Sequence, residues 1–192
     1  MILAGGAARR LGGGDKPLLD VGGETMLARV IAGLRAEPVG AVALSANGDP
    51  ARFAAFGLPV LEDGRFAGAG PLAGLLAGLD WAAGQGVSTL LTVPGDTPLL
   101  PAGLVRGLAS PPACARAGDG TAQYLVALWP VAARAALRVR LESGARKVGA
   151  FAAALGMREV AFPAAPAEAF LNVNTPADLA AARAVRSAAE RS

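Results

Sequence analysis

Three positive side chains fall within eight residues in a glycine-rich loop near the start of the chain. The loop runs from Leu3 to Lys16, reads LAGGAARRLGGGDK, and carries Arg9 and Arg10 as its other cations. Glycine lets the backbone turn sharply and bring its N–H groups close to phosphate oxygens. Arginine can donate to two oxygens at once, and lysine offers a compact charge. The loop therefore indicates binding of a nucleoside triphosphate.

The two best-known glycine motifs do not describe this loop. A P-loop needs Ser or Thr after its lysine, whereas Lys16 is followed by Pro17. The dinucleotide pattern G-x-G-x-x-G is missing here, and its near match at Gly68–Gly74 is expected by chance among 26 glycines. Because Pro17 disfavours helical geometry in the residue before it, we expect Lys16 to leave an extended segment and reach inward.

Two further motifs carry oxygen ligands. Asp96 follows an apolar run within Val93–Pro98, where magnesium could bind one carboxylate and complete its shell with phosphate and water oxygens. Asn172 and Asn174 point the same way if their segment is extended, so their amide oxygens could complete that shell or hold an acceptor phosphate. The alternatives are that Asp96 caps a turn and that Asn174 or Thr175 caps the following helix.

Three weaker candidates remain. Asn47 and Asp63 each follow an apolar run, where such residues usually shape turns. Either could instead read a purine edge, because a carboxylate accepts well from the adjacent N–H and amino groups of guanine. Arg146 stands beside Lys147 and could contact an acceptor phosphate, the alternative being a solvated loop.

Short apolar runs that alternate with helix-length segments predict an α/β fold with a mostly parallel sheet and helices on both faces. The expected strands are 1–3, 41–46, 58–61, 89–93, 123–129 and 169–173. The expected helices are 25–35, 71–81, 101–108, 131–141, 147–155 and 176–189. For the last of these, Thr175 is the expected cap, Pro176 the first-turn proline and Asp178 the acidic third residue. The first strand is expected to be very short, since Met1 lies two residues before the loop.

The polar candidates follow the expected strands rather than precede them. In open parallel sheets ligands gather at the carboxyl ends of the strands. The glycine loop, Asn47, Asp63, Asp96 and Asn174 come after successive strands. We therefore expect them to meet in one site.

The bulk composition narrows the class of protein. A chain of 192 residues with 53% hydrophobic content suits one compact domain over 1–192. It has no histidine, which excludes histidine-based triads and zinc sites, and a single cysteine, Cys114, fits a reducing cytoplasm. A net charge of +3 is too small to predict a nucleic-acid partner, and no apolar stretch is long enough to predict a membrane span.

The loop Leu3–Lys16, the segment Gly70–Gly74, the run Pro94–Pro98 and the segment Asn172–Pro176 together resemble the molybdenum cofactor guanylyltransferase family. They occur in the family's order and spacing over nearly the whole chain. One departure is Gln123-Tyr124, where the family often has His-Pro or Gln-Pro. That departure concerns the acceptor side rather than the nucleotide site.

The resemblance implies a Rossmann-like three-layer nucleotidyltransferase fold, with GTP and Mg2+ as ligands and molybdopterin or Mo-molybdopterin as acceptor. GMP would pass to the terminal phosphate of the acceptor and pyrophosphate would leave. Proteins that supply and receive the cofactor are the implied partners. By matching positions, the nucleotide would be held by Leu3, Ala4, Gly5, Gly6, Lys16, Asn47, Asp63 and Asp96.

Catalysis is assigned to three residues in this interpretation: Arg10, Lys16 and Asp96. Magnesium on Asp96 and the two cations would stabilise charge on the leaving pyrophosphate. The acceptor would be held by Arg146, Asn172 and Asn174. Two alternatives remain open: a molybdopterin cytidylyltransferase, and a non-catalytic nucleotide-binding regulatory module.

Overall fold

A computed structural model describes residues 1–5, 14–162 and 168–189, and in this part of the chain seven strands form one sheet. The strands are β1 (Ile2–Leu3), β2 (Leu44–Ser45), β3 (Val60–Leu61), β4 (Thr89–Pro94), β5 (Ala113–Arg116), β6 (Ala122–Pro130) and β7 (Arg158–Ala161). Their order in the sheet is β3-β2-β1-β4-β6-β5-β7. Strand β6 is antiparallel to β4 and β5, and the other neighbours pair in parallel.

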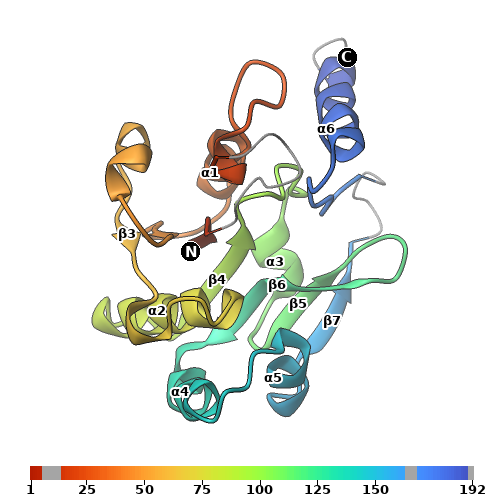
Figure 1. The fold of residues 1–192 in the computed structure, drawn as a ribbon. Helices are drawn as coiled ribbons and strands as arrows, with labels where there is room; N and C mark the ends of the chain where they lie inside the picture. Colours follow the sequence, from red (N-terminus) through yellow and green to blue (C-terminus); the bar gives the residue numbers. More distant parts are fainter. Residues whose placement is uncertain (6–13, 163–167, 190–192) are drawn as a thin grey trace.

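Helices cover both faces of this sheet (Figure 1). They are α1 (Met26–Arg35), α2 (Pro71–Gly84), α3 (Leu104–Leu108), α4 (Arg134–Glu142), α5 (Val148–Ala154) and α6 (Pro176–Ala189). Helices α2, α4 and α5 pack on one face, and α1 and α3 pack on the other. The prediction of an α/β, Rossmann-like three-layer fold is confirmed. Among the described residues, no helix combines the length and the apolar character that a bilayer crossing requires.

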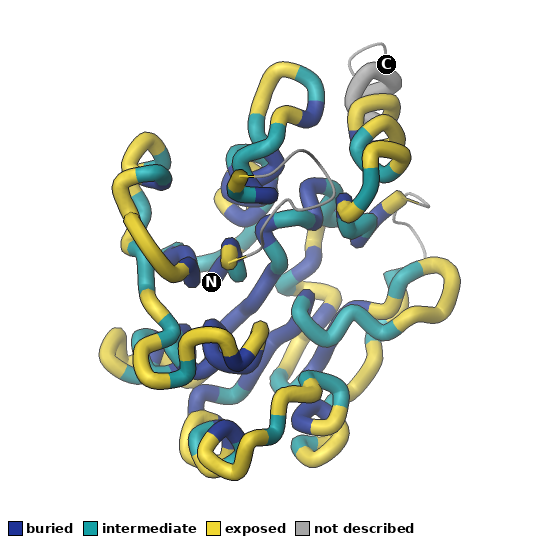
Figure 2. The backbone as a smooth tube through the Cα atoms, viewed as in Figure 1, coloured by how far each residue is buried: buried dark blue, intermediate teal, exposed yellow. Residues whose placement is uncertain are grey.

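The central strand β4 shows why the sheet is a rigid base for a site. Its side chains alternate, so that Leu90 packs under α2 while Leu91 and Val93 pack under α1 and α3. Thr92 is fully buried, and its hydroxyl accepts a hydrogen bond from Trp129 Nε1 at 2.9 Å. Figure 2 shows the sheet as the buried centre of the molecule, with the exposed residues on the surrounding helices and loops.

Helix α2 packs on the sheet through two glycines that leave no room for a side chain. A Cβ atom on Gly74 would stand 2.3 Å from Ser45 Oγ, and one on Gly78 would stand 3.0 Å from Leu90 Cδ2. Pro71 is the first residue of α2, where its missing N–H costs nothing. The close packing therefore fixes the N-terminus of α2 at the carboxyl edge of β1 and β2.

Three short 3-10 helices complete this edge: η1 (Lys16–Leu18), η2 (Pro50–Phe56) and η3 (Gly64–Phe66). A fourth, η4 (Val131–Ala133), precedes α4. Lys16 thus begins a helical turn, and the expectation that it leaves an extended segment is wrong. The extended residue is its neighbour Asp15, with φ −81° and ψ 116°.

Two strands were not predicted, and one predicted strand is absent. Strands β5 and β7 pair with each other, yet neither shows a clear alternation of apolar and polar residues. The segment 169–173 forms no strand: two of its N–H groups donate to the loop after β4, and Leu171 N donates to Glu168 O in a local turn. Phe170 N donates to Leu99 O at 3.0 Å, and Phe170 itself has a positive φ of 69°.

Candidate functional site

A cavity of about 350 Å³ opens at the carboxyl edge of β1, β2, β3 and β4. Its lining includes Lys16 and Asp96 as well as Asn47 and Asp63, which come from four different segments of the chain. Glycines contribute to the remaining wall, among them Gly5 and the residues that precede α2. The polar candidates therefore lie together at the carboxyl ends of the parallel strands, where ligands are expected to bind. This expectation is called here the strand-end rule.

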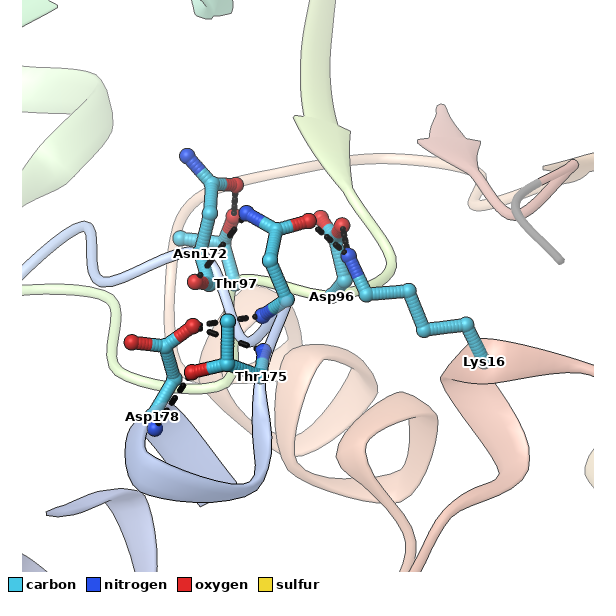
Figure 3. Close-up of polar contacts among 7 residues, drawn as sticks. Lys16, Asp96, Thr97, Asn172, Thr175 and Asp178 are labelled. Carbon is cyan, nitrogen blue, oxygen red and sulfur yellow. Dashed lines mark hydrogen bonds and ion pairs between the residues drawn. The ribbon is translucent and has the colours of Figure 1, made fainter. Parts of the chain in front are cut away.

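The first group of polar residues is called here the lysine cluster (Lys16, Asp96, Thr97, Asn172 and Asn174). Lys16 Nζ forms an ion pair with Asp96 Oδ2 and donates to Asn174 Oδ1 at 2.6 Å (Figure 3). Lys16 is only 7% exposed, so its charge needs these partners. The ammonium is held in place between a carboxylate and an amide oxygen.

The second half of the lysine cluster ties a distant segment to the loop after β4. Thr97 Oγ1 donates to Asn172 Oδ1 at 2.8 Å (Figure 3), and Val173 N donates to Asp96 O at 3.0 Å. Asn172 is therefore a partner of Thr97, and it contributes by holding the irregular segment against the site.

The start of α6 fixes the backbone of Asn174. Asp178 Oδ2 accepts hydrogen bonds from Asn174 N at 2.9 Å and from Thr175 N at 2.8 Å, while Asp178 N donates to Thr175 Oγ1 at 3.2 Å (Figure 3). The predicted cap is confirmed. The hydrogen bonds to the Asp178 carboxyl hold its pKa below the usual range, and the bond from Asn174 N has the largest effect. Capping uses the backbone of Asn174, which leaves its side chain for Lys16.

The second group is called here the Asp63 cluster (Ser45, Asn47 and Asp63). Asn47 Nδ2 donates to Asp63 Oδ2 at 2.7 Å, and Asp63 N donates back to Asn47 Oδ1 at 2.9 Å. Ser45 Oγ donates to Asp63 Oδ1 at 3.3 Å. The hydrogen-bond donors to this carboxylate in the described chain are neutral, and each of its oxygens can accept a further hydrogen bond.

Gly95 allows the segments of the lysine cluster to approach one another. A Cβ atom there would stand 3.1 Å from Pro17 Cγ and 3.4 Å from Ala4 Cα. Gly95 N also donates to Leu3 O at 2.9 Å. The loop that carries Asp96 therefore lies directly against β1 and against the turn that carries Lys16.

Residues 1–159 match the family model described as the MobA-like NTP transferase domain. The chain belongs to this family. A protein of Acidiphilium cryptum (strain JF-5) named molybdenum cofactor guanylyltransferase is 58% identical over 187 residues, which cover 97% of this chain and 94% of that protein. A protein of Rhodopseudomonas palustris (strain BisB5) with the same name is 43% identical, covering 96% of this chain and 92% of that protein.

A solved structure shows the same fold. Molybdopterin-guanine dinucleotide biosynthesis protein A from Archaeoglobus fulgidus superimposes on this MobA-like transferase with a TM-score of 0.74. The match covers 97% of each chain at 18% sequence identity, so it speaks for the fold alone. The predicted family resemblance is confirmed by the family model and the curated relatives.

The cavity of this MobA-like transferase brings most of the predicted residues together. Its lining contains Leu3, Gly5, Lys16, Asn47, Asp63 and Asp96. Ala4 is buried behind it in the core on the α1 and α3 face, and Asn174 joins through Lys16. Gly6 and Arg10 lie outside the described residues.

Arg146 is not among the described residues that line the cavity. It is exposed in the loop between α4 and α5, and its Nη1 donates to Leu141 O and Ala145 O at 3.0 Å. The guanidinium thus helps to close the end of α4. Its role toward an acceptor stays a prediction.

Two residues that contact the polar groups of the site, Ser45 and Arg52, were not predicted from the sequence motifs. Ser45 is buried, and it is the polar residue in the apolar run 41–46, a signal that marks it in retrospect. Arg52 lies in η2, five residues after Asn47, and no motif singles it out.

The donor set around Asp96 fits magnesium better than a transition metal. Among the described residues, no three Asp, Glu or Cys side chains gather as a ready-made metal site. Magnesium often needs only one or two carboxylates, because substrate phosphates and water fill its other positions. Asp96 offers one partly exposed carboxylate beside the amide oxygen of Asn174.

Proposed function

We propose that this MobA-like NTP transferase transfers GMP from GTP to the terminal phosphate of molybdopterin or Mo-molybdopterin, as a molybdenum cofactor guanylyltransferase. The observation that carries the proposal is a cavity lined by two carboxylates in different settings, Asp63 with neutral donors and Asp96 with Lys16. The names of the curated relatives, one of them 58% identical over nearly the full length, support the same activity.

In this proposal the Asp63 cluster binds guanine. Guanine presents two adjacent donors, its ring N–H and its amino group, which match the two oxygens of Asp63. Cytosine presents an amino donor beside a ring-nitrogen acceptor, which would lie against a carboxylate oxygen with no proton between them. Leaving such a pair unmatched costs about 1–3 kcal/mol. Asn47 and Ser45 hold the carboxylate in place for this choice.

The lysine cluster binds the triphosphate in this proposal. Lys16 donates to phosphate oxygens in place of its present partners Asp96 and Asn174, and Arg10, predicted from the sequence, adds a second cation. Mg2+ held by Asp96 supplies charge neutralisation at the phosphates when it is bound. Leu3, Ala4, Gly5 and Gly6 contribute backbone along the nucleotide. Lys16 is already buried at the site, and binding of the triphosphate requires it to exchange its bonds to Asp96 and Asn174 for bonds to phosphate oxygens.

The reaction joins two phosphates. An oxygen of the acceptor phosphate forms a bond to the α-phosphorus of GTP, the bond from that phosphorus to the bridging oxygen breaks, and pyrophosphate leaves. Lys16 and Arg10 balance the charge that develops on the leaving group. The acceptor phosphate is ionised at neutral pH, so no general base is needed, which agrees with a chain that has no histidine.

The acceptor side belongs to the same proposal. Asn172 and Asn174 border the Lys16–Asp96 pair, where the acceptor phosphate must approach the α-phosphorus. Arg146 would contact the acceptor from the α4–α5 loop. A cytoplasmic location, with partner proteins that supply and receive the cofactor, completes the proposal.

The first test is the thermal stability of the purified protein with GTP, CTP, ATP or UTP, each with and without Mg2+. A nucleotide at a hundredfold excess over its Kd adds about 2.7 kcal/mol, which raises Tm by roughly 5–10 °C for this size. We expect the shift with GTP and Mg2+, followed by pyrophosphate release when molybdopterin is added. Stabilisation by GTP without any pyrophosphate release would instead indicate a regulatory module, and stabilisation by CTP a cytidylyltransferase.

A further inference from the structure

The guanidinium of Arg52 touches two segments that belong to different halves of the cavity. Nη2 donates to Asn47 O at 2.5 Å, and Nη1 donates to Asp49 O at 2.6 Å. Nε lies 2.9 Å from Asp15 Oδ2. The guanidinium carbon also lies 4.7 Å from the ring centre of Phe53. One side chain thus joins the loop after β2 to the residue that precedes η1.

Both of these contacts lead directly to groups that face the ligand. The side chain of Asn47 orients Asp63, while its backbone carbonyl is held by Arg52. Asp15 immediately precedes Lys16, and its backbone carbonyl accepts the first hydrogen bond of η1. Arg52 is therefore connected to the Asp63 cluster on one side and to the lysine cluster on the other.

The environment of Arg52 is suited to holding a fixed separation. Phe53 is fully buried in the core on the α1 and α3 face, so the guanidinium packs on a ring that the core holds in place. Nε is shielded from solvent and has no aligned hydrogen-bond partner in the described chain. The ion pair with Asp15 compensates for the cost of burying this part of the guanidinium. The side chains of Arg52 and Asp15 are only 25% and 30% exposed, which limits screening by salt.

Arginine is required for this arrangement. Its planar fork directs Nη1 and Nη2 to two carbonyls, while Nε lies 2.9 Å from Asp15 Oδ2 as an ion pair without an aligned hydrogen bond. A lysine carries one nitrogen and could satisfy one of these directions, so Arg52→Lys keeps the charge and removes the connection.

We propose that Arg52 is a positioning residue that sets the distance between the Asp63 cluster and the lysine cluster to match a single guanosine triphosphate. This inference rests on the proposed function. Two linked ligand parts bind better together than apart only when their subsites are held at the matching separation. Loss of Arg52 leaves the side-chain bonds within each cluster, Asn47 to Asp63 and Lys16 to Asp96, and weakens the binding of a ligand that must occupy both.

The experiment compares GTP with its two parts, guanosine and inorganic tripolyphosphate, by titration calorimetry in the presence of Mg2+. For Arg52→Lys we expect the Kd of GTP to rise about tenfold, while the Kd values of guanosine and tripolyphosphate stay within about twofold of wild type. Asp15→Asn removes the other end of the same ion pair and should reproduce this pattern. The double variant should bind GTP within about twofold of Arg52→Lys, because both changes remove one connection.

Arg138→Lys is the matched control, since Arg138 forms a two-oxygen ion pair with Asp80 between α4 and α2 and is not among the residues that line the cavity. It should leave all three Kd values unchanged. The proposal is overturned if the affinities of guanosine or tripolyphosphate fall together with that of GTP, if GTP binding does not change, or if the two substitutions add. If Arg52→Lys does not fold, Asp15→Asn decides alone. A wild-type protein that fails to bind GTP overturns the proposed function and this inference with it.

Discussion

The lysine cluster and the Asp63 cluster each present a carboxylate to the same cavity, yet they are built in opposite ways. Asp96 is paired with a buried cation, Lys16, and its cluster draws on segments far apart in the chain. Asp63 is held by an amide and a hydroxyl from β2 and the loop that follows it. One carboxylate is thus matched to a positive charge and the other to neutral donors.

This difference separates two tasks that a nucleotidyl transfer requires. Charge on phosphates changes during the reaction, so groups that stabilise it must be charged and preorganised. The base does not change, and it is selected by matching donors to acceptors. Substitutions in the lysine cluster should therefore lower turnover, and those in the Asp63 cluster should change which nucleotide is used.

Asp96→Ala tests the lysine cluster and should have the largest effect on turnover. We expect kcat to fall by at least about a thousandfold, because the carboxylate proposed to hold Mg2+ is lost while Lys16 keeps an uncompensated charge. Asp96→Asn retains the shape and should lose nearly as much. Steady-state pyrophosphate release with GTP and molybdopterin gives the value, and activity within tenfold of wild type would contradict the role of Asp96.

Lys16→Ala should lower kcat by about a hundred- to a thousandfold, the loss expected when one contact to transition-state charge is removed. The exposed Arg35, in the last turn of α1, provides a control, and Arg35→Ala should leave kcat and KM unchanged. A rise in KM with kcat intact would show that Lys16 binds the ground state alone.

The strand-end rule was sufficient to find both carboxylates and Asn47, although Ser45 was missed and Asn174 follows no strand. It uses only the position of a polar residue after an apolar run, which is visible in the sequence for Asn47, Asp63 and Asp96. It could not find Arg52, whose role depends on the direction of a side chain toward Asp15 in a distant segment. It also could not locate Arg146, which follows a helix instead of a strand.

The fold was predictable where a strand is a clear apolar run, and it was missed at β5, which is buried but only four residues long, and at the edge strand β7. Strand β4 is an uninterrupted apolar run apart from its threonines, whereas β7 is largely exposed and carries no such signal. The segment 169–173 has strand-like composition, but Phe170 and Val173 donate to Leu99 O and Asp96 O in a loop. The composition of a segment indicates whether it is buried, but it does not indicate which group accepts its backbone hydrogen bonds.

Asp63→Asn tests the Asp63 cluster, in which neutral groups donate to the carboxylate. Asn47 Nδ2 would continue to donate to the amide oxygen of the substituted residue. The NH2 group of the substituted residue would then occupy the position of Asp63 Oδ1. An oxygen beside an NH2 group matches the edge of cytosine and mismatches guanine. We expect the preference for GTP over CTP in kcat/KM to fall about 10- to 100-fold, in line with about 1.5–3 kcal/mol for hydrogen bonds to a charged group.

The adjacent Glu62 supplies the control for this change, because it is exposed and is not among the residues that line the cavity. Glu62→Gln removes the same charge one residue away and should keep the preference for GTP. Equal losses in Asp63→Asn and Glu62→Gln would mean that overall charge, and not recognition of the base edge, sets the preference.

Gly74→Ala acts on the support beneath the Asp63 cluster. The added Cβ would stand 2.3 Å from Ser45 Oγ and 3.1 Å from Leu3 Cδ2, so Ser45 or α2 must move. Overpacking of this kind costs about 1–3 kcal/mol and should lower Tm by several degrees. Gly84, the last residue of α2, has no neighbouring atom within 4 Å, so Gly84→Ala should instead stabilise the helix by at most about 1 kcal/mol. Because Ser45 holds Asp63, Gly74→Ala should also weaken GTP binding more than tripolyphosphate binding, and equal weakening of both would place the strain outside the Asp63 cluster.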